Sequence, residues 1–208
     1  MNNTPTTIRV WDAPTRVFHW LFVFCFAGAY LTSESERWSL VHITLGYSLG
    51  GLIAFRLVWG FVGTRYARFT SFVQGPAAVV RYAKSMASGK PQHFVGHNPV
   101  GAVAIVLLIL SGIAIVATGY AAFNEIGGEW VAELHEVSSH IMLILVGIHI
   151  VGVIVASRLH RENLARAMVT GSKQGSASEG ISRLWVSVAV LLLAAVLAFW
   201  YLQLVAVA

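Results

Sequence analysis

The stretch LHEVSSHIMLILVGIH, residues 134–149, lies in a long apolar run and carries three histidines. His135 and His149 are fourteen residues apart. At about 100° per residue that spacing is within about 40° of whole turns, so an α-helix places both on one face. At about 1.5 Å per residue their Cα atoms lie about 21 Å apart. His140 points about 140° away from His135, so we expect it to pack or hydrogen-bond rather than to bind a metal.

The composition around this stretch is that of a membrane protein. Of 208 residues, 57% are hydrophobic and 11% are charged, whereas a soluble domain has about 25% charged residues. A helix needs roughly 20 apolar residues to cross a bilayer. Five stretches qualify, namely Arg16–Thr32, Ser39–Gly63, Val100–Ala121, Val131–Ser157 and Leu184–Val205. Because lipid offers the backbone no hydrogen bonds, the sequence predicts an all-α transmembrane helical bundle.

The charged residues indicate the orientation of this bundle. Every Lys and Arg except Arg37 lies in the N-terminal arm, in the second or fourth connection, or at the helix ends beside them. The first and third connections are acidic, with Glu34, Glu36, Glu125 and Glu129. The positive-inside rule therefore predicts a multi-pass protein of an inner (cytoplasmic) membrane, with a cytoplasmic N-terminus and an extracytoplasmic C-terminus. The net charge of +5 then reflects topology and needs no nucleic-acid partner.

The predicted organisation is a four-helix core followed by one more helix. Residues 1–171 form the core with its N-terminal arm, residues 172–183 form a linker in a Ser/Gly-rich segment, and residues 184–208 form an additional C-terminal transmembrane helix. Apolar and basic residues alternate over Phe69–Ala87, which predicts a helix along the membrane surface. The single cysteine, Cys25, lies in the first span and is expected to be a small buried hydrophobic residue.

Four histidines in the spans form two pairs by depth. His42 and His135 begin the second and fourth spans at the outer surface, whereas His19 and His149 lie toward the cytoplasm. Ionisable groups at such positions are candidates for function. A bis-histidine haem needs two imidazoles at equal depth on different helices. The expected ligand pairs are therefore His42 with His135 and His19 with His149, and the expected cofactors are two haem b groups.

Two further residues are placed to bind these haems. Gly46 lies one turn after His42, where the missing side chain would leave room for a flat macrocycle. An equally good explanation of this glycine is the ordinary packing of small residues between membrane helices. Arg56 lies on the same face of its helix as His42, at the depth of His19 and His149. There it would pair with a haem propionate or else extend toward the membrane surface. His160 lies among arginines and is expected to be solvated.

Several motifs resemble one known family. VWDAPTRVFHW (10–20), RLVWGFVGTRYARF (56–69), GHNP (96–99) and the 134–149 stretch resemble the b-type cytochrome subunit of nickel–iron hydrogenases, a member of the bacterial cytochrome b561-like family. The resemblance covers Ile8–Gly171. It implies a bacterial inner-membrane protein with four core helices, two haems b on the same histidine pairs, and electron exchange with a membrane quinone. His97 matches the GHNP motif, but the sequence assigns it no role.

The chain departs from hydrogenase subunits in two places. Its connection between the first two spans, Ser33–Trp38, is short, and it adds a fifth span that carries no histidine. Both departures favour an extracytoplasmic c-type cytochrome over a hydrogenase-like protein as the redox partner. The predicted function is therefore electron transfer between the quinone pool and an extracytoplasmic redox partner, a c-type cytochrome or a hydrogenase-like protein.

Two other functions fit the sequence less well. A superoxide:quinone oxidoreductase would share the fold and the haems, but it would need a basic outer funnel to attract superoxide, and the outer connections are acidic. A non-redox transporter or assembly factor would favour helix-breaking residues within spans, and few occur. Electron transfer remains the prediction that the paired histidines favour.

Overall fold

The computed structural model of the chain describes residues 6–90 and 92–205. Within them, the five long helices are α1 (Ala13–Thr32), α2 (Ser39–Val62), α5 (Pro99–Phe123), α6 (Glu129–His160) and α8 (Val186–Leu204). All five are long and apolar enough to cross a membrane. For α2, this span includes the short turn that precedes the helix. The predicted all-α membrane bundle is confirmed. Each predicted span begins and ends within three residues of the boundaries of the corresponding helix. Residues 1–5 and 206–208 of the predicted domains lie outside the described residues.

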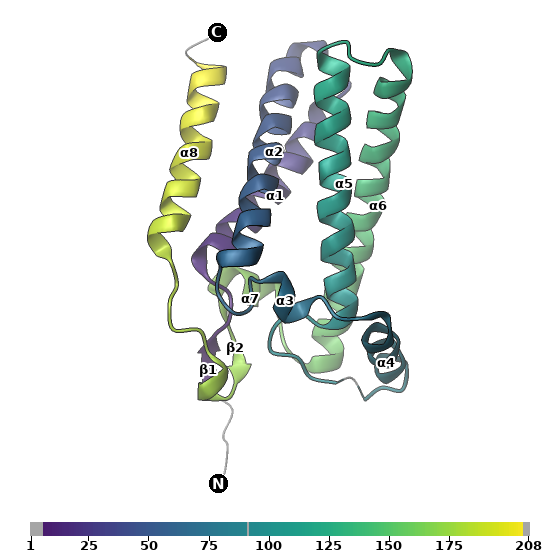
Figure 1. Cartoon of the computed structure of the whole chain (residues 1–208). Coiled ribbons are helices and arrows are strands. Elements are labelled where there is room, and N and C mark those ends of the chain that lie inside the picture. The colour runs from purple at the N-terminus through teal and green to yellow at the C-terminus, as the bar shows by residue number, and fades with distance from the viewer. Residues whose placement is uncertain (1–5, 91, 206–208) are drawn as a thin grey trace.

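The long helices form a bundle with two unlike ends (Figure 1). Helices α1, α2, α5 and α6 make up the core, and α8 packs against α1 and α2. One end, which we call the capped end, carries the short elements β1 (Thr6–Arg9), α3 (Phe69–Phe72), α4 (Pro76–Ala87), α7 (Leu164–Thr170) and β2 (Ser172–Gly175). The opposite end, which we call the open end, has the short α1–α2 and α5–α6 connections.

The segment predicted as a linker is folded onto the N-terminal arm. Strands β1 and β2 pair antiparallel, with Thr6 opposite Gly175 and Arg9 opposite Ser172. Further along, the amide of Ile181 donates to the carbonyl of Arg9 at 2.8 Å. Residues 172–181 are therefore part of the cap rather than a free tether. The polar sequence of β2 lacks the apolar alternation that predicts a strand.

Asp12 joins the start of α1 to the end of α2. Its side chain is 1% exposed, and one carboxylate oxygen accepts the amide of Thr15 at 2.8 Å as the N-cap of α1. The other oxygen accepts Nε1 of Trp59 at 3.1 Å and the hydroxyl of Thr64 at 2.6 Å. These contacts give the VWDAPTR and RLVWGFVGT motifs a shared structural purpose, because one supplies the carboxylate and the other its donors.

The core of the bundle contains Cys25, which is fully buried as predicted. Helix α8 is attached to this core by a hydrogen bond between side chains. Nε1 of Trp200 donates to the hydroxyl of Ser48 at 2.8 Å, and the Trp200 ring lies against Phe24 of α1. The fifth helix therefore has a specific docking position against α1 and α2.

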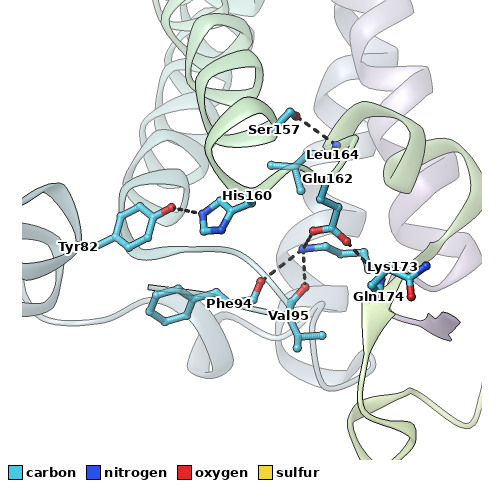
Figure 2. A network of polar contacts seen from close by, with 9 residues as sticks. All are labelled: Tyr82, Phe94, Val95, Ser157, His160, Glu162, Leu164, Lys173 and Gln174. Carbon is cyan, nitrogen blue, oxygen red and sulfur yellow. Dashed lines mark hydrogen bonds and ion pairs between the residues drawn. The ribbon is translucent and has the colours of Figure 1, made fainter. Parts of the chain in front are cut away.

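A buried lysine holds the cap together (Figure 2). Nζ of Lys173 lies 3.0 Å from the Glu162 carboxylate and donates to the carbonyls of Val95 at 3.0 Å and Phe94 at 3.4 Å. Glu162 in turn accepts the amide of Gln174 at 3.3 Å. Strand β2, the turn after α6 and the loop before α5 are thereby joined at one point.

The surface expectations for two segments were only partly right. His160 is partly buried rather than solvated, and its Nε2 hydrogen-bonds the hydroxyl of Tyr82 at 3.1 Å, because Tyr82 of α4 reaches the end of α6 (Figure 2). The helix expected over Phe69–Ala87 is two helices, α3 and α4, separated by residues 73–75. Pro76 explains the break, since the residue before a proline disfavours helical geometry.

Replacing Lys173 is expected to destabilise the cap. Lys173→Met keeps the length of the side chain but leaves the Glu162 carboxylate without its cation, which costs about 3 kcal/mol when one partner of a buried pair is removed. The measurement is chemical denaturation in detergent. Adding Glu162→Gln should recover part of the loss; a double variant less stable than Lys173→Met alone would contradict this account.

Candidate functional site: two histidine pairs in the bundle

The histidine pair at the open end has the spacing of two ligands of one metal ion. His42 of α2 and His135 of α6 lie beside each other, with ring centroids 6.2 Å apart and ring planes 83° apart. A metal–imidazole bond of about 2 Å, with the bonding nitrogen about 1 Å from its ring centre, puts two ligating rings about 6 Å apart. The predicted pair His42–His135 is therefore brought together by the fold at ligating distance.

The remaining ring nitrogens of this pair are already used by the backbone. Nδ1 of His42 hydrogen-bonds the carbonyl of Ala29 at 2.8 Å, and Nδ1 of His135 hydrogen-bonds the carbonyl of Ile115 at 3.0 Å. Because a carbonyl only accepts, each Nδ1 carries the proton. Each Nε2 then keeps its lone pair free, which is the usual arrangement of a metal-binding histidine.

A cavity of about 640 Å³ lies between α1, α2, α5 and α6 at the open end, and both imidazoles line it. This volume is typical of a site for a cofactor-sized ligand. Gly46 also lines the cavity, and a Cβ built on it would meet no atom within 4 Å. Gly46 is thus not a close helix-packing contact in this structure. The open space beside it fits a flat macrocycle next to His42.

The pair at the capped end consists of His19 of α1 and His149 of α6, both partly buried. Nδ1 of His19, Nη1 of Arg56 and Nδ1 of His97 are buried and have no hydrogen-bond partner among the described residues. Burial, with Arg56, Lys173, His149 and His19 around it, lowers the pKa of His97 to about 3. The fold therefore gathers these groups at the capped end, several of them with unsatisfied polar atoms.

Each pair supplies two protein ligands for a metal ion. In residues 6–90 and 92–205, no group of three or more His, Cys, Asp or Glu side chains is placed to hold one. Two neighbouring imidazoles with open space between the helices instead suit an iron whose other four ligands come from a porphyrin. The donor set and the cavity at the open end thus fit haem.

Comparison with known proteins decides the family. Residues 10–171 match the family model described as prokaryotic cytochrome b561. The chain belongs to the prokaryotic cytochrome b561 family. Membership makes it a helical membrane protein of a b-type cytochrome family, for which haem b is the implied cofactor, and the matched residues include both histidine pairs.

The similar proteins are cytochrome subunits of hydrogenases. The probable Ni/Fe-hydrogenase 1 B-type cytochrome subunit of Escherichia coli K12 is 29% identical over 56% of this chain and 60% of its own length. The probable Ni/Fe-hydrogenase B-type cytochrome subunits of Rhizobium leguminosarum and Rhodobacter capsulatus are each 23% identical. The alignment with the Rhizobium protein covers 80% of this chain and 89% of that protein. The alignment with the Rhodobacter protein covers 81% of this chain and 82% of that protein. No solved structure matches the chain.

Arg56 of this b561 cytochrome is held inside the protein. It is 3% exposed, and its guanidinium lies 4.7 Å from the ring centre of Phe69 and 6.0 Å from that of Phe72. A residue extending to the membrane surface would not be enclosed in this way. The structure thus favours an internal role for Arg56 close to the His19–His149 pair.

His140 of the cytochrome lies at the wall of the open-end cavity but makes the local contacts expected of it. Its Nδ1 hydrogen-bonds the carbonyl of Glu136 at 3.0 Å, and its ring lies edge-on to Tyr30 with centroids 6.1 Å apart. Glu34 and Glu136 line the same cavity. The charged groups in this lining are therefore acidic.

Gly119 of α5 is a site residue that sequence reasoning missed. A Cβ built on Gly119 would lie 2.8 Å from Cε1 and 3.1 Å from Nδ1 of His135. The glycine therefore makes room for the His135 ring against α5. Helix α5 carries no histidine, so no depth or pairing argument could have singled this position out.

Gly119→Ala is expected to disturb the open-end site of the cytochrome. The new methyl group would push the His135 ring away from the Ile115 carbonyl, weakening haem retention there about 10- to 100-fold. Haem content of the purified protein and its absorbance bands measure this. Gly51→Ala is the matched control, because a Cβ there meets no atom within 4 Å. Equal haem content in both variants would show that Gly119 does not position His135.

Proposed function

We propose that this protein is a transmembrane dihaem b-type cytochrome that transfers electrons between the membrane quinone pool and an extracytoplasmic redox partner. The observation that carries the proposal is the His42–His135 pair, with ring centroids 6.2 Å apart and both Nδ1 atoms hydrogen-bonded away from the gap. His19 and His149 would hold the second haem at the capped end.

Each part of the chain has a defined task in this scheme. Each haem, when bound, supplies reversible one-electron transfer at its iron. The backbone carbonyls orient the imidazoles of His42 and His135, and Gly46 leaves room beside them. Arg56 would neutralise a propionate of the haem at the capped end. Helix α6 contributes one ligand to each site, with Cα atoms about 21 Å apart along its axis, so a single rigid helix sets the distance between the haems.

The proposed topology places the capped end in the cytoplasm. The Lys and Arg residues other than Arg37 belong to this end, which is the side that the positive-inside rule assigns to the cytoplasm. We propose that quinone exchanges electrons at the haem there. The open end, with Glu34, Glu36, Glu125 and Glu129, would face a basic partner, because complementary charge steers association.

The partner is proposed to be a c-type cytochrome or a hydrogenase-like protein. Acidic residues at the open end suit the basic face of a c-type cytochrome, whereas the similar bacterial proteins are named as hydrogenase cytochrome subunits. The short connection at residues 33–38 and the added helix α8 favour the c-type cytochrome.

Electron transfer between quinol and a c-type cytochrome tests the proposal directly. In proteoliposomes, a short-chain quinol is expected to reduce the haems, and added ferric c-type cytochrome to reoxidise them at a rate that falls with ionic strength. Haems that exchange electrons with neither quinol nor quinone would contradict the proposal. Haem reduction by superoxide at a diffusion-limited rate, without reaction with the c-type cytochrome, would instead support a superoxide:quinone oxidoreductase.

A further inference from the structure

The imidazole of His97, in the loop before α5, is in contact with two aromatic rings. The ring centroid of Trp11 lies 4.5 Å from that of His97, and the ring centroid of Phe72 lies 4.8 Å from it. Trp11 is 6% exposed and Phe72 is 2% exposed. Three segments far apart in the sequence therefore fix one imidazole, which leaves its ring little freedom to turn.

The polar atoms beside this ring lack the partners that buried groups normally have. Nδ1 of His97, Nη1 of Arg56 and Nδ1 of His19 are all buried and unpaired among the described residues. Leaving a buried donor or acceptor unsatisfied costs about 1–3 kcal/mol. Unpaired groups on three separate segments at the same end of the bundle indicate that a polar ligand group belongs there.

The carboxylates of the chain nearest to this place are already engaged. Both oxygens of Asp12 accept hydrogen bonds from neighbouring residues. Glu162 is paired with Lys173 and accepts the amide of Gln174. The groups left over include the Arg56 cation and the ring of His97, and the cation favours an anion as the ligand group. The acidic groups of a haem are its two propionates.

We infer that His97 is a positioning residue for the haem of the capped end, and that its ring and the Arg56 guanidinium together bind the propionates of that haem. The inference rests on the proposed function, because it requires a haem between His19 and His149. It assigns a role to the histidine of the GHNP motif. The aromatic rings of Trp11 and Phe72 then orient the His97 ring, and Asp12 lies near enough to act on Arg56 electrostatically.

The two ends of the bundle differ in the charge of the groups that would meet the propionates. No Lys or Arg of the described chain lines the cavity at the open end, whose charged lining residues are Glu34 and Glu136. A donor that partly neutralises a propionate stabilises the reduced haem and raises its reduction potential. A change at His97 should therefore lower the potential of one haem and leave the other unchanged.

The experiment compares His97→Phe and His97→Asn with His93→Asn, a matched histidine that lies exposed in the same loop. Each is introduced into full-length protein and into two backgrounds, His42→Ala, which keeps the capped-end haem, and His19→Ala, which keeps the open-end haem. Spectroelectrochemical titration gives the midpoint potentials, and haem extraction gives the occupancy. Titration of the full-length protein provides the same readout if a background variant is poorly stable.

His97→Phe alone is expected to lower the midpoint potential of the capped-end haem. The double variant His97→Phe with Arg56→Gln is expected to retain that haem about 10- to 100-fold more weakly. His97→Asn, which keeps an amide donor, should lie between His97→Phe and the unsubstituted protein. His93→Asn should match the unsubstituted protein. The open-end haem should titrate alike in all of them.

The inference is overturned if His97→Phe and His93→Asn give the same potential and occupancy at the capped end, or if His97→Phe shifts both haems equally. Either result, in a protein that still binds two haems, would contradict the role of His97 without contradicting the proposed dihaem function. Unsubstituted protein with fewer than two haems would instead overturn the proposed function.

Discussion

His135→Ala is expected to remove the haem at the open end and to leave the other in place, so that haem content falls from two to one per chain. Of the proposed ligand pair only His42 would remain, and a single axial ligand cannot form the low-spin bis-histidine site. Haem extraction and the low-temperature absorbance spectrum measure the loss. His149→Ala should give the mirror result, with the haem at the capped end missing.

His140→Ala is the matched control for this substitution. His140 lies on the same helix, five residues from His135, and its Nδ1 hydrogen-bonds only its own helix. We therefore expect His140→Ala to keep both haems. Loss of both haems from His135→Ala in a folded protein, or unchanged haem content, would contradict the assignment of His135 as a ligand of one haem.

Asp12→Ala is expected to destabilise the protein about as much as Lys173→Met. It removes the N-cap of α1, worth about 1 kcal/mol, and leaves the buried indole of Trp59 without its acceptor, which costs about 1–3 kcal/mol. The total is about 3 kcal/mol. It also removes the carboxylate near Arg56, so the occupancy of the capped-end haem is a second readout. Denaturation in detergent and haem content measure the two effects.

Asp12→Asn separates these contributions. An asparagine can still accept the amide of Thr15 as an N-cap, but its amide nitrogen only donates and so can accept from neither Trp59 nor Thr64. We expect a loss of about half that of Asp12→Ala. If Asp12→Asn and Asp12→Ala are equally destabilising, the N-cap contributes nothing measurable. If neither destabilises the protein, the link between α1 and α2 has been misjudged.

The helices could be predicted from the sequence because lipid imposes a simple rule on them. A span must be apolar, helical and about as long as the bilayer is thick, and α1, α2, α5, α6 and α8 obey that rule. The cap could not be predicted in the same way. Its strands β1 and β2 have four residues each and are stabilised by pairing between segments more than 160 residues apart, which leaves no local pattern.

The same contrast applies to the site. The pairing of His42 with His135 follows from depth and helical phase, both of which are properties of one helix at a time. The contact between Gly119 and His135 depends on how α5 turns against α6, and the contacts of His97 depend on the loop before α5 meeting the start of α1 and α3. Contacts of this kind arise only after the helices have packed.

The measurement that tests the account most directly is a quantitative redox titration of the absorbance spectrum of the purified protein, combined with extraction of its haem. We expect two haems b per chain, both low-spin with bis-histidine ligation, and two resolvable midpoint potentials. A single haem per chain, no haem, or haem iron held by side chains other than His19, His42, His135 and His149 would contradict the account.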